Sequence, residues 1–201
     1  MRAPLDAGRR ARAGLIAVGV HRPEARLTAL RSGRAAGGTG GWQTPTMVIK
    51  RSAGILLFRG QAHDLEVLLG HMGGPFWAGR DRQAWSLPKG EYGPDETPLA
   101  AAEREFEEEL GLPVPQGPRV ELGQARQHSG KIVTAWAVEA DLDPALVTPG
   151  TFAMEWPRGS GHIQRFPELD RADWFDLAAA ADRIVAGQRV FLDRLTERLR
   201  A

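Results

Sequence analysis

The 201-residue sequence contains no cysteine, which excludes disulfide bonds and cysteine-based metal sites. It also lacks a run of about 20 apolar residues, the length that a membrane-spanning helix needs. Five histidines are present, but none has the paired spacing of zinc motifs, so zinc is not expected. A chain without cysteine suits a reducing compartment, and we expect a cytoplasmic protein with no membrane partner.

The charge is unevenly distributed. Residues 1–46 contain eight Arg, no Lys and two acidic residues, a net charge of +6, while the remainder carries 18 basic and 23 acidic residues, a net charge of −5. The first segment is rich in Arg, Ala and Gly and lacks the apolar stretch of a secretory signal. We therefore expect residues 1–46 to be a mostly disordered leader, with a fragmentary helix around Glu24 to Leu30. RNA binding or organelle targeting by this Arg-rich segment is the less favoured reading.

Met47 directly precedes the first expected strand, and we predict that it is the true start of the protein. Mass spectrometry of the native N-terminus tests this, because a peptide that spans Thr46 and Met47 would refute it. The whole chain is 42% hydrophobic, and residues 47–201 form its main part. They are enough to bury one core and form one domain.

A short helix is predicted over Pro98 to Leu110. Thr97 is a suitable N-cap before a first-turn proline, and Gly111 is a typical C-terminal stop. At 3.6 residues per turn, Leu99, Ala102, Phe106 and Leu110 form an apolar stripe. Glu105, Glu108 and Glu109 fall together on an adjacent arc, where the small Ala101 is expected to leave room above them.

Three carboxylates on one arc are a poor way to stabilise a fold. Two such charges about 4 Å apart repel by roughly 4 kcal/mol near a protein surface. A divalent cation reverses the sign of this interaction. Mg²⁺ and Mn²⁺ prefer carboxylate oxygen and water, and they commonly share their coordination shell with substrate phosphates. The helix therefore predicts a metal site that also binds a polyphosphate.

The segment around this helix has a fixed pattern. Gly90 is followed by Glu96, then by Arg104-Glu105, then by Glu108-Glu109, and Gly111-Leu112 closes it. This spacing fits G-x5-E-x7-R-E-U-x-E-E-x-G-U, with a bulky apolar residue at U, at every fixed position. From Gly90 to Leu112 the chain thus resembles the Nudix hydrolases, which cleave a nucleoside diphosphate linked to another group.

The resemblance implies a fold and a set of roles. The fold would be α/β, an α/β/α sandwich with a mixed β-sheet and a loop-helix-loop motif. Glu105, Glu108 and Glu109 would bind Mg²⁺, with Mn²⁺ as a substitute, and the Gly90 carbonyl would be a further ligand. Glu96 and Arg104 would form an ion pair between loop and helix.

The flanking sequence supports this fold independently. Short apolar runs at Ser52 to Phe58 and Leu65 to Leu69 predict a hairpin, and Ile132 to Val138 predicts another strand. A last short strand is expected to begin at Ala172 to Phe175. Helices are expected over Leu177 to Val185 and Arg189 to Leu199.

The general base is left open. Glu105 and Glu109 are favoured, but a base from outside the motif is also known for the resembled family. Glu155 and Glu168 are the candidates for that role, and each could equally be a solvated loop residue.

Several residues near the motif could contact substrate. Trp85 followed by Leu87-Pro88-Lys89-Gly90 is similar to Nudix members that act on dinucleoside polyphosphates or oxidised nucleoside triphosphates. Trp85 itself is expected in the core. In the loop predicted from His71 to Ala84, Phe76 and Trp77 are as suited to stacking on a base as to packing. The basic candidates for phosphate contacts are Lys89, Arg126, His128, Lys131, Arg158, His162 and Arg165.

The favoured function is Mg²⁺-dependent hydrolysis of a dinucleoside polyphosphate or a damaged nucleoside triphosphate. The alternatives are a hydrolase of ADP-ribose or nucleotide sugars and a Nudix module that senses a nucleotide without cleaving it. A small nucleotide is the expected partner, and nucleic acid is not. The oligomeric state is left open.

Overall fold

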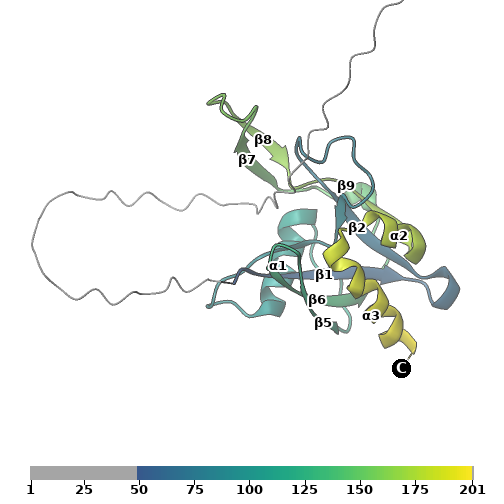
Figure 1. Ribbon diagram of the computed structural model, residues 1–201. Helices are drawn as coiled ribbons and strands as arrows, with labels where there is room; N and C mark the ends of the chain where they lie inside the picture. The colour runs from purple at the N-terminus through teal and green to yellow at the C-terminus, as the bar shows by residue number, and fades with distance from the viewer. Residues whose placement is uncertain (1–48, 201) are drawn as a thin grey trace, which may run out of the picture. The chain divides into compact units, whose positions relative to one another are not determined.

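The computed structural model describes residues 49–200. The leader over 1–46 and the start at Met47 lie outside the described residues, so both stay predictions. Within residues 49–200 the chain forms one mixed sheet, a separate hairpin and three α-helices (Figure 1). The strands are β1 (Arg51–Arg59), β2 (Glu66–Met72), β3 (Trp85–Ser86), β4 (Lys89–Glu91), β5 (Val120–Arg126), β6 (Ile132–Glu139), β7 (Thr151–Glu155), β8 (Ile163–Pro167) and β9 (Leu169–Asp176). The α-helices are α1 (Pro98–Leu110), α2 (Leu177–Arg183) and α3 (Arg189–Arg200), and short 3-10 helices cover Ala62–Asp64, Pro144–Leu146 and Ala186–Gln188.

The main sheet has the strand order β3-β2-β1-β6-β5, with β4 also pairing with β1 and β9 with β2. The central pair, β1 and β6, is parallel, and the other pairs in this sheet are antiparallel. This is the mixed sheet that the sequence predicts. None of the helices within residues 49–200 is long and apolar enough to span a membrane.

The two faces of the sheet are covered by different helices. Along β1, Leu56 and Phe58 belong to one buried cluster, while Ile55 and Leu57 belong to the other. This follows from the alternation of side chains along a strand. The first cluster also contains Phe191 and Leu195 of α3 and Ala180 of α2. The second contains Ala102, Phe106 and Leu110 of α1. The α/β/α sandwich is thereby confirmed.

Helix α1 begins and ends where predicted. The Thr97 hydroxyl accepts a hydrogen bond of 3.3 Å from the Ala100 amide, and Gly111 adopts the left-handed conformation at φ 69°. Its amide donates to the Glu107 carbonyl at 2.8 Å, which ends the helix. Ala101 is fully buried in the core cluster on the α1 side of the sheet, so the buried stripe of α1 is wider than the sequence predicts. Leu99 is only half-buried.

Other differences concern the strands. The expected hairpin and the strand from Ile132 are confirmed, but the last strand begins earlier, at Leu169, because it pairs along β2 as far as Met72. His71 was expected in a loop but lies in β2 with 2% exposure. Strands β3, β4, β5, β7 and β8 were not predicted.

Candidate active site

The site is built where β4 faces the middle of α1. Gly90 of β4 pairs with Ala53 of β1 and lies directly against the Glu105 side chain. A Cβ atom added to Gly90 would stand 1.9 Å from the Glu105 carboxyl carbon. Any larger residue at this position would therefore displace the Glu105 carboxylate from its place against β4.

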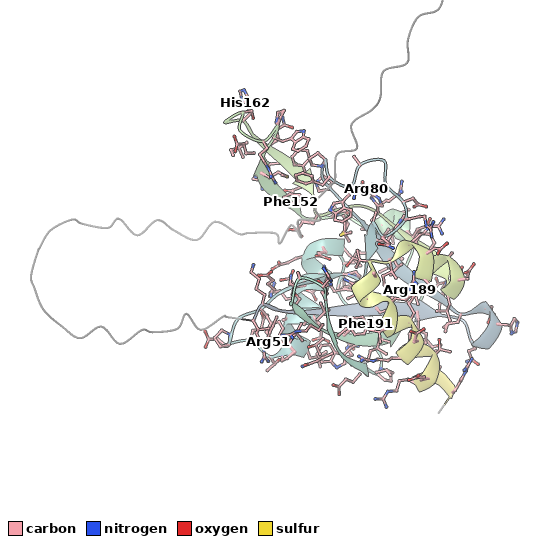
Figure 2. The ribbon with its side chains drawn as sticks, viewed as in Figure 1. Arg51, Arg80, Phe152, His162, Arg189 and Phe191 are labelled. Atoms are coloured by element: carbon pink, nitrogen blue, oxygen red, sulfur yellow. The ribbon has the colours of Figure 1, made fainter. Side chains whose placement is uncertain are left out.

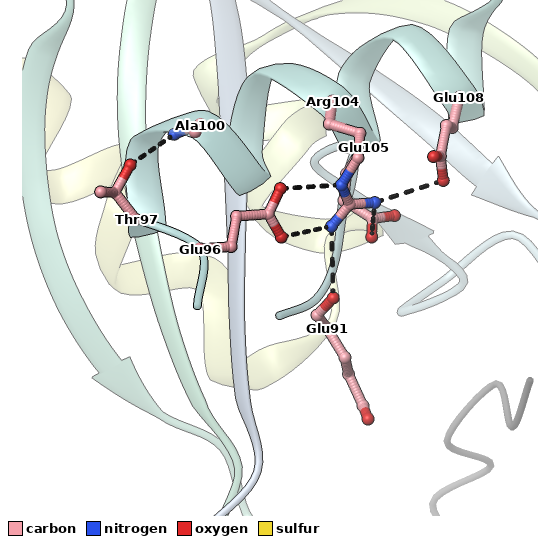
Figure 3. A network of polar contacts seen from close by, with 7 residues as sticks. All are labelled: Glu91, Glu96, Thr97, Ala100, Arg104, Glu105 and Glu108. Atoms are coloured by element: carbon pink, nitrogen blue, oxygen red, sulfur yellow. Dashed lines mark hydrogen bonds and ion pairs between the residues drawn. The ribbon is translucent and has the colours of Figure 1, made fainter. Parts of the chain in front are cut away.

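Arg104 connects the loop to the helix (Figure 3). Its guanidinium donates two hydrogen bonds of 2.9 Å to the Glu96 carboxylate, and the Glu96–Arg104 ion pair is thus confirmed. It also donates to Glu105 at 2.6 Å and to Glu108 at 3.3 Å. The hydrogen bonds to Glu96, and then those to Glu105, raise the Arg104 pKa far above its ordinary value, and Arg104 in turn lowers the pKa of Glu96. The Arg104 guanidinium is therefore the shared ion-pair partner of three carboxylates.

Glu109 contacts the backbone of the residue before Gly90. One of its carboxylate oxygens accepts a 3.0 Å hydrogen bond from the Lys89 amide. Burial raises its pKa to about 8, and the charges of Glu105 and Glu168 act in the same direction, against the favourable effect of Lys89. Glu109 is thus costly to ionise in the absence of a further cation.

Negative charge also collects at the C-terminal turn of α1. This turn contains Glu107, Glu108 and Glu109 and no basic residue, although the partial charge at a helix C-terminus is itself negative. Glu168 adds to it: the Gly150 amide donates to the Glu108 carbonyl at 3.1 Å, and a Cβ on Gly150 would stand 3.3 Å from a Glu168 carboxylate oxygen. This concentration of negative charge destabilises the end of the helix, and it is suited to binding a cation.

The chain's three lysines lie beside this acidic centre. Lys50 and Lys131 both form ion pairs with Glu91, at 3.4 and 3.0 Å. Burial and the positive charge of nearby Lys89 lower the pKa of Lys131, while the ion pair with Glu91 opposes that shift. Lysines this close together repel one another, and they are suited to contact an anion such as a phosphate.

Comparison with known proteins agrees with this geometry. A profile of the NUDIX domain matches residues 48–195. The chain belongs to the Nudix family. Membership assigns it to the Nudix-type pyrophosphohydrolases, enzymes that act on phosphoric anhydrides.

Two solved structures illustrate the shared fold. A binary complex of the Caenorhabditis elegans Ap4A hydrolase is 21% identical, with 74% of this chain and 98% of that chain covered and a TM-score of 0.53. The NUDIX domain of Shewanella oneidensis NrtR complexed with ADP ribose is 17% identical, with 79% and 94% covered and a TM-score of 0.51. At these identities the likeness concerns the fold. A comparison with curated proteins finds no match.

The structure brings most of the predicted Nudix residues together. Glu96, Arg104, Glu105 and Glu108 share the network around the guanidinium. Glu109 accepts a hydrogen bond from the Lys89 amide, next to Gly90, and Glu168 lies at the C-terminal end of the same helix.

Other candidates lie elsewhere. Glu155 is on the β7–β8 hairpin, where its carboxylate accepts a 2.6 Å hydrogen bond from the Gly161 amide. Arg165 is on the same hairpin and donates to the Thr151 hydroxyl at 3.3 Å. Arg126 and His128 are exposed at the β5–β6 turn. Trp85 is 2% exposed and packs edge-on against His71 and Phe175, which confirms its place in the core.

Sequence reasoning missed two contributors. Gly150 is hydrogen-bonded to both Glu168 and the end of α1. Glu91 forms ion pairs with two of the lysines. Glu91 follows Gly90 directly, and a strand through Lys89 to Glu91 would have placed its side chain on the face opposite to Gly90. No sequence signal identified Gly150, because its contact depends on the long-range path of the chain.

The approach of Gly90 to Glu105 leads to a prediction for the Nudix site. Gly90→Ala forces the Glu105 carboxylate away from β4, so we expect at least a tenfold loss of kcat/KM in nucleotide hydrolysis, because small displacements at a reacting centre are costly. Gly93→Ala is the matched control, since a Cβ there meets no atom within 4 Å. Equal activities of the two variants would show that the position of Glu105 is not critical.

Proposed function

We propose that this Nudix protein hydrolyses a diphosphate linkage in a nucleoside polyphosphate with the help of Mg²⁺. The observation that carries the proposal is the acidic C-terminal turn of α1, where Glu109 has a raised pKa and Glu168 adds a further carboxylate. Such a concentration of charge opposes folding unless a cation binds there. A cation that also binds phosphate would connect the acidic turn to the lysines nearby.

The donor set fits Mg²⁺ or Mn²⁺. It consists of carboxylates together with the Gly90 carbonyl oxygen. Hard divalent cations prefer such oxygen ligands. As they stand, no three His, Asp or Glu side chains among residues 49–200 are close enough to hold a metal ion, because Arg104 draws Glu105 and Glu108 to itself. We infer that these two side chains turn from Arg104 when they bind metal, with Glu109 and the Gly90 carbonyl completing the protein ligands. When bound, the cation supplies Lewis-acid catalysis and a lowered pKa of the attacking water.

The remaining roles belong to the protein's own side chains. Glu96 keeps Arg104 in place, and Arg104 ties the loop to the helix. Glu168 is the preferred general base, since it lies beside the metal-binding helix without belonging to it, and Glu105 and Glu109 remain the alternatives. Glu155 is no longer favoured, because it supports the tip of the hairpin.

Lys89 and Lys131 are the best candidates for contacts to the phosphate chain. The Lys89 amide donates to Glu109, and the Lys131 ammonium forms an ion pair with Glu91. Arg126 lies farther along the same turn, and we assign it only a part in attracting an anionic substrate. Arg165 is assigned to the hairpin and not to the phosphates.

The preferred substrates are dinucleoside polyphosphates and damaged nucleoside triphosphates, on the strength of the Trp85 to Gly90 sequence. ADP-ribose or nucleotide sugars are the alternative. One of the two similar structures is an Ap4A hydrolase and the other is a complex with ADP ribose. They therefore do not distinguish between the two substrate classes. A chain without cysteine suits a reducing interior, and we propose the cytoplasm as its location.

A substrate panel tests the proposal. Diadenosine tetraphosphate, 8-oxo-dGTP, dGTP, ADP-ribose and UDP-glucose are incubated with the protein and Mg²⁺, and the products are separated by chromatography. We expect hydrolysis of one of the first two, abolished by excess chelator. Turnover of ADP-ribose or UDP-glucose alone would establish the alternative class, and binding without turnover of any member would identify a nucleotide sensor.

A further inference from the structure

One end of the β7–β8 hairpin is hydrogen-bonded to α1, and the other end is hydrogen-bonded to the first. Just before β7, the Gly150 amide donates to Glu108, and just after β8, the Glu168 amide donates to the Gly150 carbonyl at 2.9 Å. The Gly73 amide, at the start of the loop after β2, donates to the Glu168 carbonyl at 2.9 Å. Hairpin and loop therefore both start at the proposed metal site, and the hairpin projects from the sheet (Figure 1).

One face of the hairpin packs on that loop. Phe152 lies opposite Phe166 across the strands, so the two share a face, and their ring centroids are 6.1 Å apart. A Cβ on Gly74 would stand 3.1 Å from the Phe152 ring. Figure 2 shows Phe152 near the attached end of the hairpin and His162 at its tip.

Farther out, two more rings and one cation meet. Phe76 of the loop packs edge-to-face against Trp156, with centroids 5.2 Å apart and planes at 80°. The exposed Arg158 guanidinium lies 5.9 Å from the Phe76 centroid. Both rings are partly exposed, and neither is among the residues of the two described core clusters, whereas neighbouring Trp77 packs against the α3 side of the core.

This arrangement is suited to a planar aromatic ligand. An edge-to-face pair uses one face of one ring, so other faces stay available for stacking. Arginine adds a flat cation that also stacks on a base. We propose that Phe76, Trp156 and Arg158 bind the nucleobase of the substrate, while its phosphate chain extends to the carboxylates of α1 and to Lys89.

The distances agree with that placement. Phe76 follows Gly73 by three residues, so its Cα lies within about 11 Å of the Gly73 Cα. The Gly73 amide is hydrogen-bonded to the Glu168 carbonyl. Along the hairpin, Trp156 is six residues beyond Gly150, at most about 20 Å. These upper limits place both rings within a span that the sugar and phosphates of a nucleotide can bridge. The inference rests on the proposed function and adds where the base binds.

Steady-state kinetics test the inference with whichever nucleotide of the panel is hydrolysed, and with inorganic tripolyphosphate as a competitive inhibitor that has no base. For Trp156→Leu and Phe76→Leu we expect KM for the nucleotide to rise about ten- to hundredfold, the range that loss of base stacking produces. The kcat should stay within about twofold, since ground-state binding is what is lost. The inhibition constant of tripolyphosphate should not change.

Trp156→Phe keeps a ring and should recover most of the affinity. Ile163→Ala is the control, because Ile163 lies on the same hairpin with 68% exposure and has no part in the proposed base site. Unchanged KM in both leucine variants would overturn the inference while hydrolysis by the wild type upheld the function. A parallel loss of nucleotide and tripolyphosphate affinity would overturn it too, by showing a general disturbance of the site. The two leucine variants lie in different segments, so misfolding of one leaves the other as a test.

Discussion

Glu109→Gln lowers kcat/KM for the hydrolysed nucleotide by about 10³-fold, within the range of a positioned charged group at a reacting centre. The amide keeps the shape of the side chain and can still accept the hydrogen bond from the Lys89 amide. It loses the negative charge that a cation requires. The measurement is kcat and KM at saturating Mg²⁺, together with the shift in melting temperature that Mg²⁺ produces.

Two further variants sharpen this result. Glu107→Gln removes a carboxylate from the same turn, but Glu107 is exposed, so its activity should match the wild type. Glu168→Gln should lose kcat while keeping the Mg²⁺-induced rise in melting temperature, because a base is lost and the metal ligands remain. If Glu109→Gln kept both its activity and its response to Mg²⁺, Glu109 would not be a metal ligand.

The same residue makes stability depend on pH. Its pKa is about 8 in the folded protein and near 4.5 when unfolded, so the folded state holds the proton more tightly. The contribution of this bound proton to the free energy of unfolding is fully present below pH 4.5, and it is lost as the pH rises through 8. Without metal, we expect Glu109→Gln to exceed the wild type in free energy of unfolding at pH 8 by on the order of 4 kcal/mol, and by little at pH 4.5.

Chemical unfolding at the two pH values with chelator measures this difference. Mg²⁺ should stabilise the wild type more at pH 8 than at pH 6, since metal and proton compete for the same carboxylate. An unchanged difference between the variants from pH 4.5 to 8 would show that Glu109 ionises normally in the folded protein.

The loop and helix around Glu109 could be foreseen because their signals are local. Thr97, Gly111 and the apolar stripe each act within a few residues, and the structure has the helix with the predicted bounds. The position of Ala101 could not be found this way, since the width of the buried stripe depends on how α1 meets β1. A 100° periodicity gives the direction of a side chain, and the neighbouring strands decide whether it is covered.

The hairpin shows the complementary limit. Phe152 and Met154 alternate with polar or small residues, a weak strand signal. Its attachment to α1 depends on Gly150, which a single hydrogen bond joins to Glu168 at the far end of the hairpin. Glu155 and Glu168 were equal candidates for the base in the sequence. Only the attachment of the hairpin to α1 separates them.

Arg104→Met should destabilise the metal-free protein by about 2 kcal/mol, less than the 3–5 kcal/mol for breaking a fully buried pair because Arg104 is partly exposed. Three carboxylates lose their shared cation when this side chain is removed. With saturating Mg²⁺ the loss should shrink, since Glu105 and Glu108 would then have the metal and Glu96 alone would lack its partner. Melting temperatures with chelator and with Mg²⁺ give the comparison, and about 4–8 °C is expected without metal.

The control for this variant is Arg82→Met, which removes an arginine with 80% side-chain exposure and a single 3.6 Å contact to Asp182. It should shift the melting temperature by less than about 1 °C in both conditions, as exposed ion pairs contribute little. The decisive quantity is the difference between the Arg104→Met shifts with and without Mg²⁺. Equal shifts would mean that Glu105 and Glu108 stay with Arg104 when metal is present, and the proposed exchange of one cation for another would be wrong.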